Sequence, residues 1–388
     1  MSERITALVT GGAGLIGSHI VDEALARGWD IRVLDSLERQ THRHGKPAWI
    51  PAAVDFVRGD IRNRRDWERA LDGIDVVFHE AAYGGYMPEI AKFVHVNSYG
   101  TALMLETIRD RRLPVRKVVV ASSQAVYNEG AYACPIHGRF YGSTRPTAQL
   151  AQGDYAIHCP SCGAAATPMP TDEGAPMGGE NVYAITKADQ ERLVISWGRS
   201  TGTPVVALRY SCTYGPRQSV FNPYTGVIAI FCTRLLNDLP PVVYEDGGQM
   251  RDLIFVEDVA RANILVATDD RADGRVFNVG TGQAVTIGGL AQLLASRLGK
   301  DIRPHLPGEY RPGEMRALVS DIARIAELGF APKIDLASGI DHYLAWIAEQ
   351  GNIADYFGAA ERRLRRRQVV KRVKGAATRE SAIAGGGS

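Results

Sequence analysis

TGGAGLIG, residues 10–17, decides the fold of this 388-residue chain, because it joins an apolar, strand-like run to a stretch with helical periodicity. A glycine at the first position permits a tight turn, the second lets the backbone approach a pyrophosphate, and the third lets the helix pack closely on the strand. Free N–H groups at the helix N-terminus favour a bound phosphate. We therefore predict a dinucleotide-binding turn rather than a glycine-rich turn without a ligand. The predicted cofactor loop comprises Gly11, Gly14, Leu15, Ile16 and Gly17.

Asp35 ends the next apolar run, IRVLD (31–35). Its carboxylate can accept hydrogen bonds from a ribose diol and would repel a 2′-phosphate, so we predict NAD rather than NADP. Residues after the third and fourth runs are expected to flank the adenine or to let the cofactor lie against the backbone; a surface turn and good packing are the competing interpretations. These residues are Asp60, Ile61, Ala81 and Ala82.

The alternation of β-branched apolar runs with helical stretches fills the first half of the chain. Continuous apolar runs are typical of strands that are buried on both faces. The pattern predicts an α/β fold with a doubly wound parallel sheet, the Rossmann arrangement, followed by a smaller C-terminal lobe.

The expected domain boundaries follow from changes in this pattern. Residues 1–210 are predicted to form the NAD-binding domain, with 129–171 as an inserted segment that is rich in Gly, Pro, Ala and Tyr. Residues 211–350 should mainly form a substrate-binding lobe, although part of 240–268 is expected to return to the NAD-binding domain. Residues 351–388 are expected to be a basic, partly disordered tail, for which a solvated terminus is favoured over contact with an anionic partner.

The composition is that of a soluble globular protein, with 45% hydrophobic and 23% charged residues and a net charge of +2. This excludes disordered and fibrous classes. No apolar run reaches the roughly 18 residues of a membrane span, and the chain passes from MSER directly into a strand without a signal peptide. We therefore expect a cytoplasmic protein without membrane contact.

Tyr183 and Lys187 lie four residues apart in a helical stretch, which places both side chains on one face. A tyrosine has a pKa of about 10, so it needs a downward shift of roughly two to three units to act as a base near neutrality. A neighbouring ammonium group and a cationic nicotinamide ring can supply that shift. Ser123 follows the fifth run, at the edge where doubly wound sheets bind ligands, and its hydroxyl can hydrogen-bond a reacting oxygen.

The motifs resemble a known family when they are taken together in this order: TGGAGLIG, SSQAVY (122–127), YAITK (183–187), RYSCTYGPRQ (209–218), RDLIFVEDVARA (251–262), FNVGTG (277–282) and RPGE (311–314). Over about residues 4–350, apart from the inserted segment, the chain resembles the extended short-chain dehydrogenase/reductases, in the branch of nucleotide-sugar epimerases and dehydratases. The resemblance implies that Tyr183 takes the sugar 4-OH proton, that Ser123 steadies the oxygen, and that Lys187 holds the nicotinamide ribose.

Gln124 and Ala125 stand where the 4,6-dehydratases of this branch carry an Asp-Glu pair and the decarboxylases a Glu. Without an acid to protonate a departing hydroxyl, dehydration is poorly supported and a 4-epimerase is favoured. The alternatives are another nucleotide-sugar epimerase, a 4-ketoreductase or a 4,6-dehydratase. A non-catalytic, zinc-dependent nucleic-acid binder is a remote alternative, because it would not need Ser123, Tyr183 and Lys187 together.

The resemblance also implies a substrate site. Arg251 and Arg311 are expected to grip the nucleotide diphosphate, and Tyr244 is a candidate wall for the base. Cys212 stands where most relatives have an Asn that contacts the diphosphate, so either Thr213 or Arg217 replaces that contact or the substrate differs. The remaining expected contacts are Tyr83, Arg217 and Asn222 with the substrate and Asn97 on the cofactor side, where Asn97 ties backbone near the site.

Cys134-Pro-Ile-His137 and Cys159-Pro-Ser-Cys162 have the spacing of two zinc knuckles and predict a Cys₃His zinc site, with His158 as the alternative nitrogen ligand. Four protein ligands close the metal shell, so the zinc is expected to be structural. A similar insertion followed by PTDE is associated with the dTDP-L-rhamnose 4-epimerases of this branch, which interconvert dTDP-L-rhamnose and dTDP-6-deoxy-L-talose. A dTDP sugar is therefore the favoured substrate. Family analogy implies a homodimer through helices near 89–112 and 181–201, with Leu193 and Trp197 as face or core residues.

Overall fold

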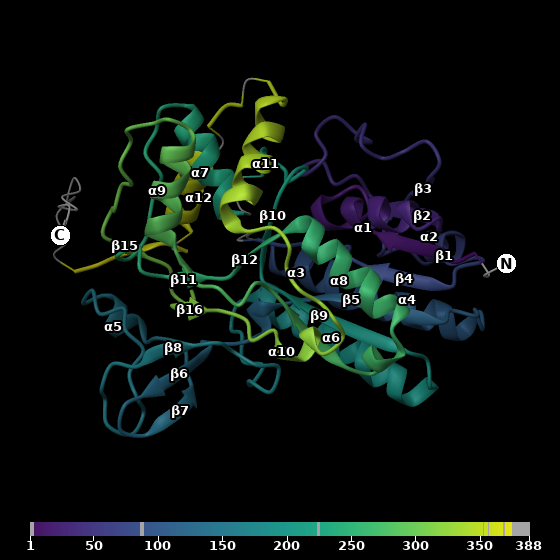
Figure 1. Cartoon of the computed structure of the whole chain (residues 1–388), viewed down its shortest axis with the longest axis horizontal. Helices are drawn as coiled ribbons and strands as arrows, with labels where there is room; N and C mark the ends of the chain where they lie inside the picture. The colour runs from purple at the N-terminus through teal and green to yellow at the C-terminus, as the bar shows by residue number, and fades with distance from the viewer. Residues whose placement is uncertain are drawn as a thin grey trace.

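A seven-stranded sheet forms the centre of the computed structural model (Figure 1). The structure describes residues 4–374 except 86–88, 223–225, 352, 356 and 368. The strands of the central sheet are β1 (Thr6–Thr10), β2 (Asp30–Asp35), β3 (Asp55–Arg58), β4 (Val76–His79), β5 (Lys117–Ser123), β9 (Val205–Tyr210) and β13 (Val276–Val279). Their order is β13-β9-β5-β4-β1-β2-β3, and all of these pairings are parallel. The predicted doubly wound parallel sheet is confirmed.

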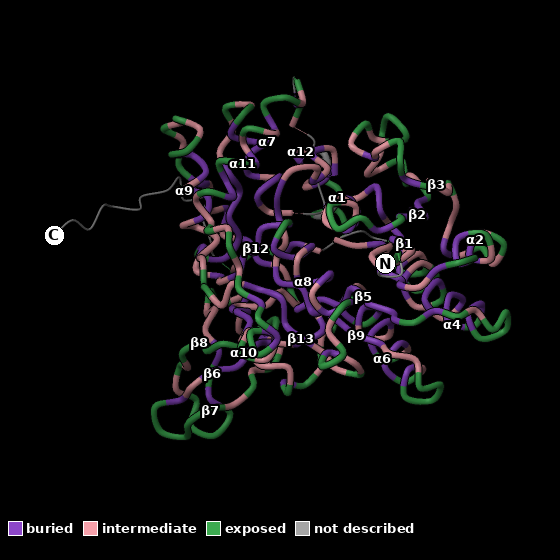
Figure 2. Tube along the Cα trace, turned by 45° about the vertical axis from the view of Figure 1, so that its right-hand side comes forward, coloured by how far each residue is buried: buried purple, intermediate pink, exposed green. Residues whose placement is uncertain are grey.

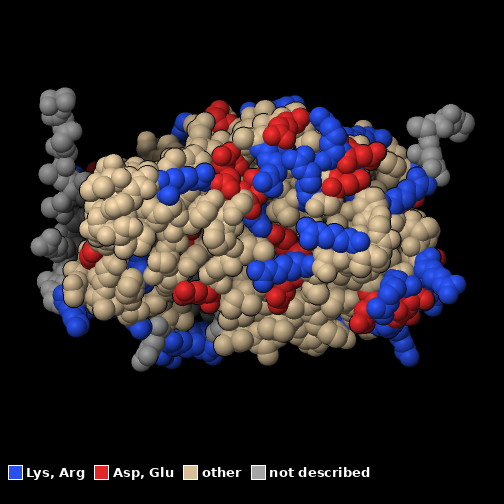
Figure 3. Space-filling view, turned by 90° about the horizontal axis from the view of Figure 1, so that it is seen from below, with Lys and Arg blue, Asp and Glu red and all other residues tan. Residues whose placement is uncertain are grey.

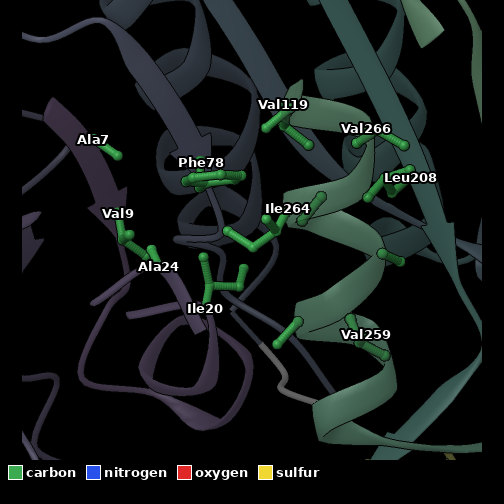
Figure 4. Close-up of a cluster of buried hydrophobic side chains, with 14 of the residues drawn as sticks. Ala7, Val9, Ile20, Ala24, Phe78, Val119, Leu208, Val259, Ile264 and Val266 are labelled. Carbon is green, nitrogen blue, oxygen red and sulfur yellow. The ribbon is translucent and has the colours of Figure 1, made fainter. Parts of the chain in front are cut away.

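Helices cover both faces of this sheet. One face packs against α1 (Leu15–Ala26) and α8 (Val256–Thr268), and the other against α2 (Arg64–Ala70), α4 (Gly100–Asp110) and α6 (Val182–Thr201). Side chains alternate along β1, so that Ala7 and Val9 join the first cluster and Leu8 joins the second. In Figure 4, Ile20 of α1 and Ile264 of α8 lie in the same cluster as Phe78 of β4. Burial on both faces explains why the strands read as continuous apolar runs.

A second lobe packs around its own apolar core, which includes Phe255, Leu290 and Tyr343. Its helices are α7 (Val227–Leu236), α9 (Ile287–Arg297) and α11 (Leu336–Ala348), whereas α10 (Ala323–Ala326) packs on β13 of the central sheet. Short strands connect them: β10 (Cys212–Tyr214) pairs with β12 (Leu253–Phe255), and β11 (Met250–Arg251) lies between β14 (Val285–Thr286) and β16 (Ala317–Leu318). Helix α8, which directly follows β12 along the chain, returns to the central sheet.

The inserted segment forms a small antiparallel sheet at the lower left of Figure 1. Its elements are β6 (Ala131–Cys134), β7 (Gly138–Tyr141), β8 (Thr167–Met169) and the short helix α5 (Thr147–Leu150). A buried arginine fastens it to the second lobe: Arg145 lies 3.4 Å from the Glu129 carboxylate, 2.9 Å from that of Glu245, and donates to the Glu314 carbonyl oxygen over 2.6 Å. The side chains of Arg145, Glu129 and Glu245 are all buried, so the arginine and the two carboxylates compensate one another's charge in the absence of water.

The predicted basic tail contains ordered elements over the part that the structure describes. Helix α12 (Phe357–Arg366) is followed by β17 (Lys371–Arg372), which pairs antiparallel with β15 (Glu309–Tyr310). Residues 375–388 lie outside the described residues. Figure 2 shows buried residues along the central sheet and exposed residues at the outer turns, including the turn beside β7.

Surface charges are mixed on the face shown in Figure 3, where Lys and Arg side chains are interspersed with Asp and Glu. This face therefore lacks the continuous basic surface that favours nucleic acid. Among the helices that the structure describes, none has the length and apolar character needed to cross a membrane.

Candidate active site

A cavity of about 930 Å³ lies between the carboxyl ends of the central strands and the second lobe. It brings together residues that are far apart in the sequence. The predicted residues that line it are Gly11, Gly14, Leu15, Ile16, Gly17, Asp35, Asp60, Ile61, Ala81, Ala82, Tyr83, Ser123, Tyr183, Lys187, Asn222, Tyr244, Arg251 and Arg311.

The glycine loop has no room for side chains. Gly11 has a φ of +66°, and a Cβ there would lie 3.0 Å from the Ala81 backbone. A Cβ on Gly17 would lie 2.4 Å from the Gly11 carbonyl oxygen. Asp35 accepts hydrogen bonds from the backbone N–H groups of Ala13 (3.0 Å) and Leu37 (2.8 Å), which fixes its carboxylate beside the loop. The loop and Asp35 thus form a preorganised site for a dinucleotide.

Helix α6 carries the catalytic candidates. Asn181 caps it by accepting from the Ala184 N–H, so the helix starts just before Tyr183. The Lys187 ammonium donates to the Ala121 carbonyl oxygen (2.6 Å) and to Gln190 (2.8 Å). Burial lowers the pKa of Lys187 to about 8, against the opposing charge of Glu80.

The expected acidification of Tyr183 by Lys187 does not emerge from the protein residues. Burial raises the pKa of Tyr183; a hydrogen bond with Ser123 opposes this, while the nearby Cys212 and Glu80 reinforce it. The physical reason is that the partly buried phenol loses contact with water at the cavity wall, while the ammonium group donates to Ala121 and Gln190. The lowering that a general base needs must therefore come largely from a cationic ring bound in the cavity.

Glu80 is a cavity residue that the sequence analysis missed. It follows β4 directly, and the Tyr210 hydroxyl donates to its carboxylate over 3.0 Å. Burial raises the pKa of Glu80 to about 7, although Tyr210 and Lys187 favour the ionised form. The sequence feature that could have predicted Glu80 is an acidic residue directly after a buried strand, at the carboxyl edge where doubly wound sheets bind ligands.

A pH-dependent stability follows from Glu80. An unfolded Glu ionises near pH 4.5, whereas folded Glu80 does so near pH 7, so the folded state holds the extra proton and its stability falls as pH rises through this window. We expect Glu80→Gln to lose less unfolding free energy between pH 5 and pH 7.5 than the wild type, as measured by urea denaturation. Glu68→Gln, which removes a half-exposed acid on α2 that lies outside the cavity, is the matched control. Parallel pH curves for the wild type and Glu80→Gln would contradict this assignment.

Gln124 and Cys212 form a pair in the same cavity. The Gln124 amide donates to the Cys212 sulfur over 3.1 Å, and burial raises the pKa of this thiol. The Gln124 Oε1 atom is buried and has no hydrogen-bond partner among the described residues. It is therefore available to accept from a donor on a bound substrate.

Two arginines mark the opposite end of the cavity. Arg251 lies 3.2 Å and Arg311 lies 3.9 Å from the Glu314 carboxylate, and the Arg311 guanidinium sits 4.4 Å from the Tyr244 ring centroid. Planar guanidinium groups in this arrangement suit a diphosphate.

Arg217 and Asn97 are not among the described residues that line the cavity, unlike the other predicted binding residues. Arg217 contacts α1 instead, with its guanidinium 2.7 Å from the Asp22 carboxylate. Asn97 is fully buried on a π-helical turn (Val94–Tyr99), where its amide accepts from the Tyr83 N–H and donates to the Tyr83 carbonyl oxygen. It ties backbone near the site, as the sequence indicated.

The inserted segment brings its predicted zinc ligands together. The ligand atoms of Cys134, His137, Cys159 and Cys162 all lie within 4.8 Å of one another. The Cys134 sulfur is 3.7 Å from that of Cys162, and the Cys159 sulfur is 3.5 Å from His137 Nδ1. Tetrahedral zinc with Zn–S bonds of about 2.3 Å gives edges of about 3.8 Å between sulfurs, so these side chains fit the ion.

His158 does not join this cluster. Its Nε2 lies 2.8 Å from the Asp154 carboxylate and its Nδ1 lies 3.0 Å from the Gly163 carbonyl oxygen. Both ring nitrogens are thus engaged, which leaves His137 as the nitrogen ligand.

The fold and the site define a Rossmann-type enzyme with a preformed dinucleotide site and a Ser-Tyr-Lys set beside it. A family model described as "NAD dependent epimerase/dehydratase family" matches residues 7–280. The chain belongs to this family, and the prediction of an NAD-dependent epimerase is confirmed at that level.

Individual relatives agree with this assignment. The chain is 32% identical to a dTDP-L-rhamnose 4-epimerase of Burkholderia thailandensis, over 88% of this chain and 95% of that protein. It is 30% identical to a putative UDP-glucose 4-epimerase of Methanocaldococcus jannaschii, over 88% and 97%. A crystal structure of Thermus thermophilus UDP-glucose 4-epimerase in complex with NAD superimposes with a TM-score of 0.70 at 31% identity, over 89% and 99%.

Proposed function

We propose that this protein is a nucleotide-sugar 4-epimerase that acts by transient oxidation at C4 and interconverts dTDP-L-rhamnose and dTDP-6-deoxy-L-talose. The observation that carries the proposal is the meeting of Ser123, Tyr183 and Lys187 in one cavity that has no carboxyl group at positions 124 and 125. An acid at those positions would favour elimination of water, whereas this set supports reversible oxidation.

The chain's own residues provide the proton chemistry. When bound, NAD supplies a reversible acceptor for the C4 hydride. Tyr183 takes the proton of the 4-OH and later returns it, and the Ser123 hydroxyl holds the same oxygen by hydrogen bonding. Lys187, with a pKa of about 8, is mainly cationic at neutral pH and would hold the nicotinamide ribose by hydrogen bonding. Because the hydride returns to the opposite face of the same sugar, no net redox change occurs.

A dTDP sugar is proposed on two grounds. The inserted segment and the similarity to the Burkholderia enzyme both favour it. Arg251 and Arg311 fit the diphosphate of any nucleotide sugar, so UDP and GDP sugars are the competing substrates. The Cys212 thiol, held by Gln124, leaves the diphosphate without the usual amide contact.

The test is a panel of dTDP, UDP and GDP sugars incubated with the purified protein without added NAD. We expect NMR to show inversion at sugar C4 with no change in NADH absorbance, and with dTDP sugars turned over fastest. Formation of a 4-keto-6-deoxy product would assign the protein to the dehydratases. Stoichiometric consumption of NADH would assign it to the 4-ketoreductases.

We also propose that Cys134, His137, Cys159 and Cys162 bind one structural zinc ion. The backbone N–H groups of His137 and Ile136 lower the pKa of Cys134 to about 6, which favours the thiolate that zinc binds. The segment has few core-forming residues, so metal binding would supply much of its folding free energy.

Removal of a zinc ligand should loosen the inserted segment. We expect Cys162→Ser to lower the zinc content from about one ion per chain to near zero and to open residues 129–171 to proteolysis. Atomic emission and limited trypsin digestion measure these two effects. Cys212→Ser, which replaces a cysteine outside the cluster, should keep its zinc. A variant that lost its metal but resisted trypsin like the wild type would contradict the structural role.

A homodimer is proposed through the helical surface formed by α3 (Ile90–Phe93), the π-helical turn and α6, elements that pack against one another. Four large apolar side chains are exposed there: Ile90 (64%), Val94 (48%), Tyr99 (46%) and Ile185 (49%). Apolar side chains that cluster on a surface mark an association site. Leu193 and Trp197 instead pack against the core cluster under α6.

Charging this surface should separate the dimer. We expect Ile90→Asp combined with Ile185→Asp to give a monomer by light scattering, because the interface would bury two unpaired carboxylates. Leu236→Asp, at an exposed apolar residue (39%) on α7, should leave the mass unchanged. A wild-type protein that is already monomeric at micromolar concentration would refute the dimer.

A further inference from the structure

The C-terminal strap, residues 353–374, forms part of the cavity wall. Phe357 is buried, Val369 is half-buried, and both line the cavity together with Tyr244 and Arg311. The strap lies beyond the range matched by the family model, which ends at residue 280. It is also the basic segment for which the sequence suggested only a solvated terminus.

An apolar cluster holds the strap in place. Phe357, Ala360 and Val370 pack against Val242 and Tyr244 as a group that is separate from the other cores. Burial of these apolar side chains favours the position of the strap against the lobe.

Hydrogen bonds anchor the strap to the strand that precedes Arg311. β17 pairs with β15, which ends at Tyr310, and the Arg365 guanidinium donates to the Glu309 carboxylate over 3.0 Å. The strap therefore supports the backbone position from which Arg311 enters the cavity.

Two further contacts extend the strap across the structure. Arg363 lies 3.6 Å from the Glu89 carboxylate, and Glu89 accepts from the hydroxyl of the cavity residue Tyr83 over 2.9 Å. At the other end, the Lys374 N–H donates to the Ala151 carbonyl oxygen of the inserted segment over 2.8 Å. The strap is thus tied to the NAD-binding domain, the second lobe and the insertion.

The end of the cavity beside Arg251 and Arg311 combines a cationic part with an apolar part. Arg251 and Arg311 offer cationic groups, while Tyr244, Phe357 and Val369 offer an aromatic and aliphatic wall beside them. A ligand that fits both parts carries a diphosphate next to a flat, weakly polar ring. We propose that Phe357 and Val369 contact the base of the substrate's nucleoside diphosphate, so that the C-terminal strap determines nucleotide affinity; this rests on the proposed nucleotide-sugar function.

The test compares two ligands that share the phosphates but not the base. Isothermal titration of the NAD-containing, full-length protein would give the Kd values for dTDP and for inorganic pyrophosphate. We expect Phe357→Ala to weaken dTDP binding about tenfold or more, because base–aromatic contacts are typically worth that much, and to leave pyrophosphate binding unchanged. Phe357→Leu, which keeps the apolar packing, should give an intermediate Kd for dTDP with a wild-type unfolding midpoint.

Arg366→Ala is the matched control, because Arg366 is exposed on the same helix and does not line the cavity. It should leave both Kd values unchanged. Equal dTDP affinity in Phe357→Ala and the wild type would overturn the inference. Equal weakening of both ligands would also overturn it, since the strap would then act only by positioning Arg311. A wild-type protein that binds neither dTDP nor UDP would instead refute the proposed function.

Discussion

Replacement of Tyr183 by phenylalanine is expected to lower kcat for C4 epimerisation by about 10²–10⁴-fold, the usual contribution of a positioned general base. The hydroxyl is the only group removed, and the ring keeps its place beside Phe93, whose centroid is 6.4 Å away. Because Lys187 is held by Ala121 and Gln190 rather than by the phenol, its position should not change. The KM should change far less than kcat.

The control is Tyr141→Phe, which removes a hydroxyl from an exposed tyrosine on β7 that hydrogen-bonds Asp172. We expect its kcat to equal that of the wild type. Rates are measured by NMR under substrate saturation, and NAD content by absorbance after denaturation. Full activity of Tyr183→Phe with normal NAD content would remove the chemical basis of the proposed mechanism.

Replacement of Gly17 by alanine should empty the cofactor site. The new Cβ would approach the Gly11 carbonyl oxygen to 2.4 Å, and because both partners are backbone, neither can rotate away. The loop must change shape, which is expected to cost about 1–3 kcal/mol of stability and to lower NAD occupancy more than tenfold. Activity should fall in proportion to the occupancy.

Gly299→Ala separates these effects. Gly299 has a φ of +65° and no neighbour within 4 Å of an added Cβ, so alanine there costs about 1 kcal/mol through backbone strain alone. It should lower the unfolding midpoint and keep the full NAD content. Retention of NAD by Gly17→Ala would show that the helix N-terminus does not bind the cofactor.

The central sheet and the cofactor loop were predictable because local sequence determines them. Strands that are buried on both faces read as apolar runs, and the turn after β1 requires glycine for steric reasons that involve only nearby backbone. The cluster of Cys134, His137, Cys159 and Cys162 was equally predictable, because CxxH and CxxC pairs fix the spacing of these side chains along the chain.

Contacts between residues that are far apart in the sequence could not be predicted from local sequence patterns. Arg217 lies in a family motif, yet it forms an ion pair with Asp22 of α1. Nothing in the local sequence indicates that pairing. The pKa of Tyr183 depends on burial against segments that are distant in the sequence, among them those that carry Glu80 and Cys212. Phe357 looked like part of a basic tail because its partners, Val242 and Tyr244, are more than a hundred residues away.

The buried contacts of Arg145 make the insertion inseparable from the enzyme that carries it. Excision of residues 129–171 would remove Arg145 and leave the buried Glu245 carboxylate with Arg316, 3.2 Å away, as its remaining counter-charge, so the folded protein would lose one of the two cations that compensate this charge. Designers who wish to shorten this protein, or to transplant the inserted segment into another epimerase, would have to redesign the contacts of Glu245 together with the segment.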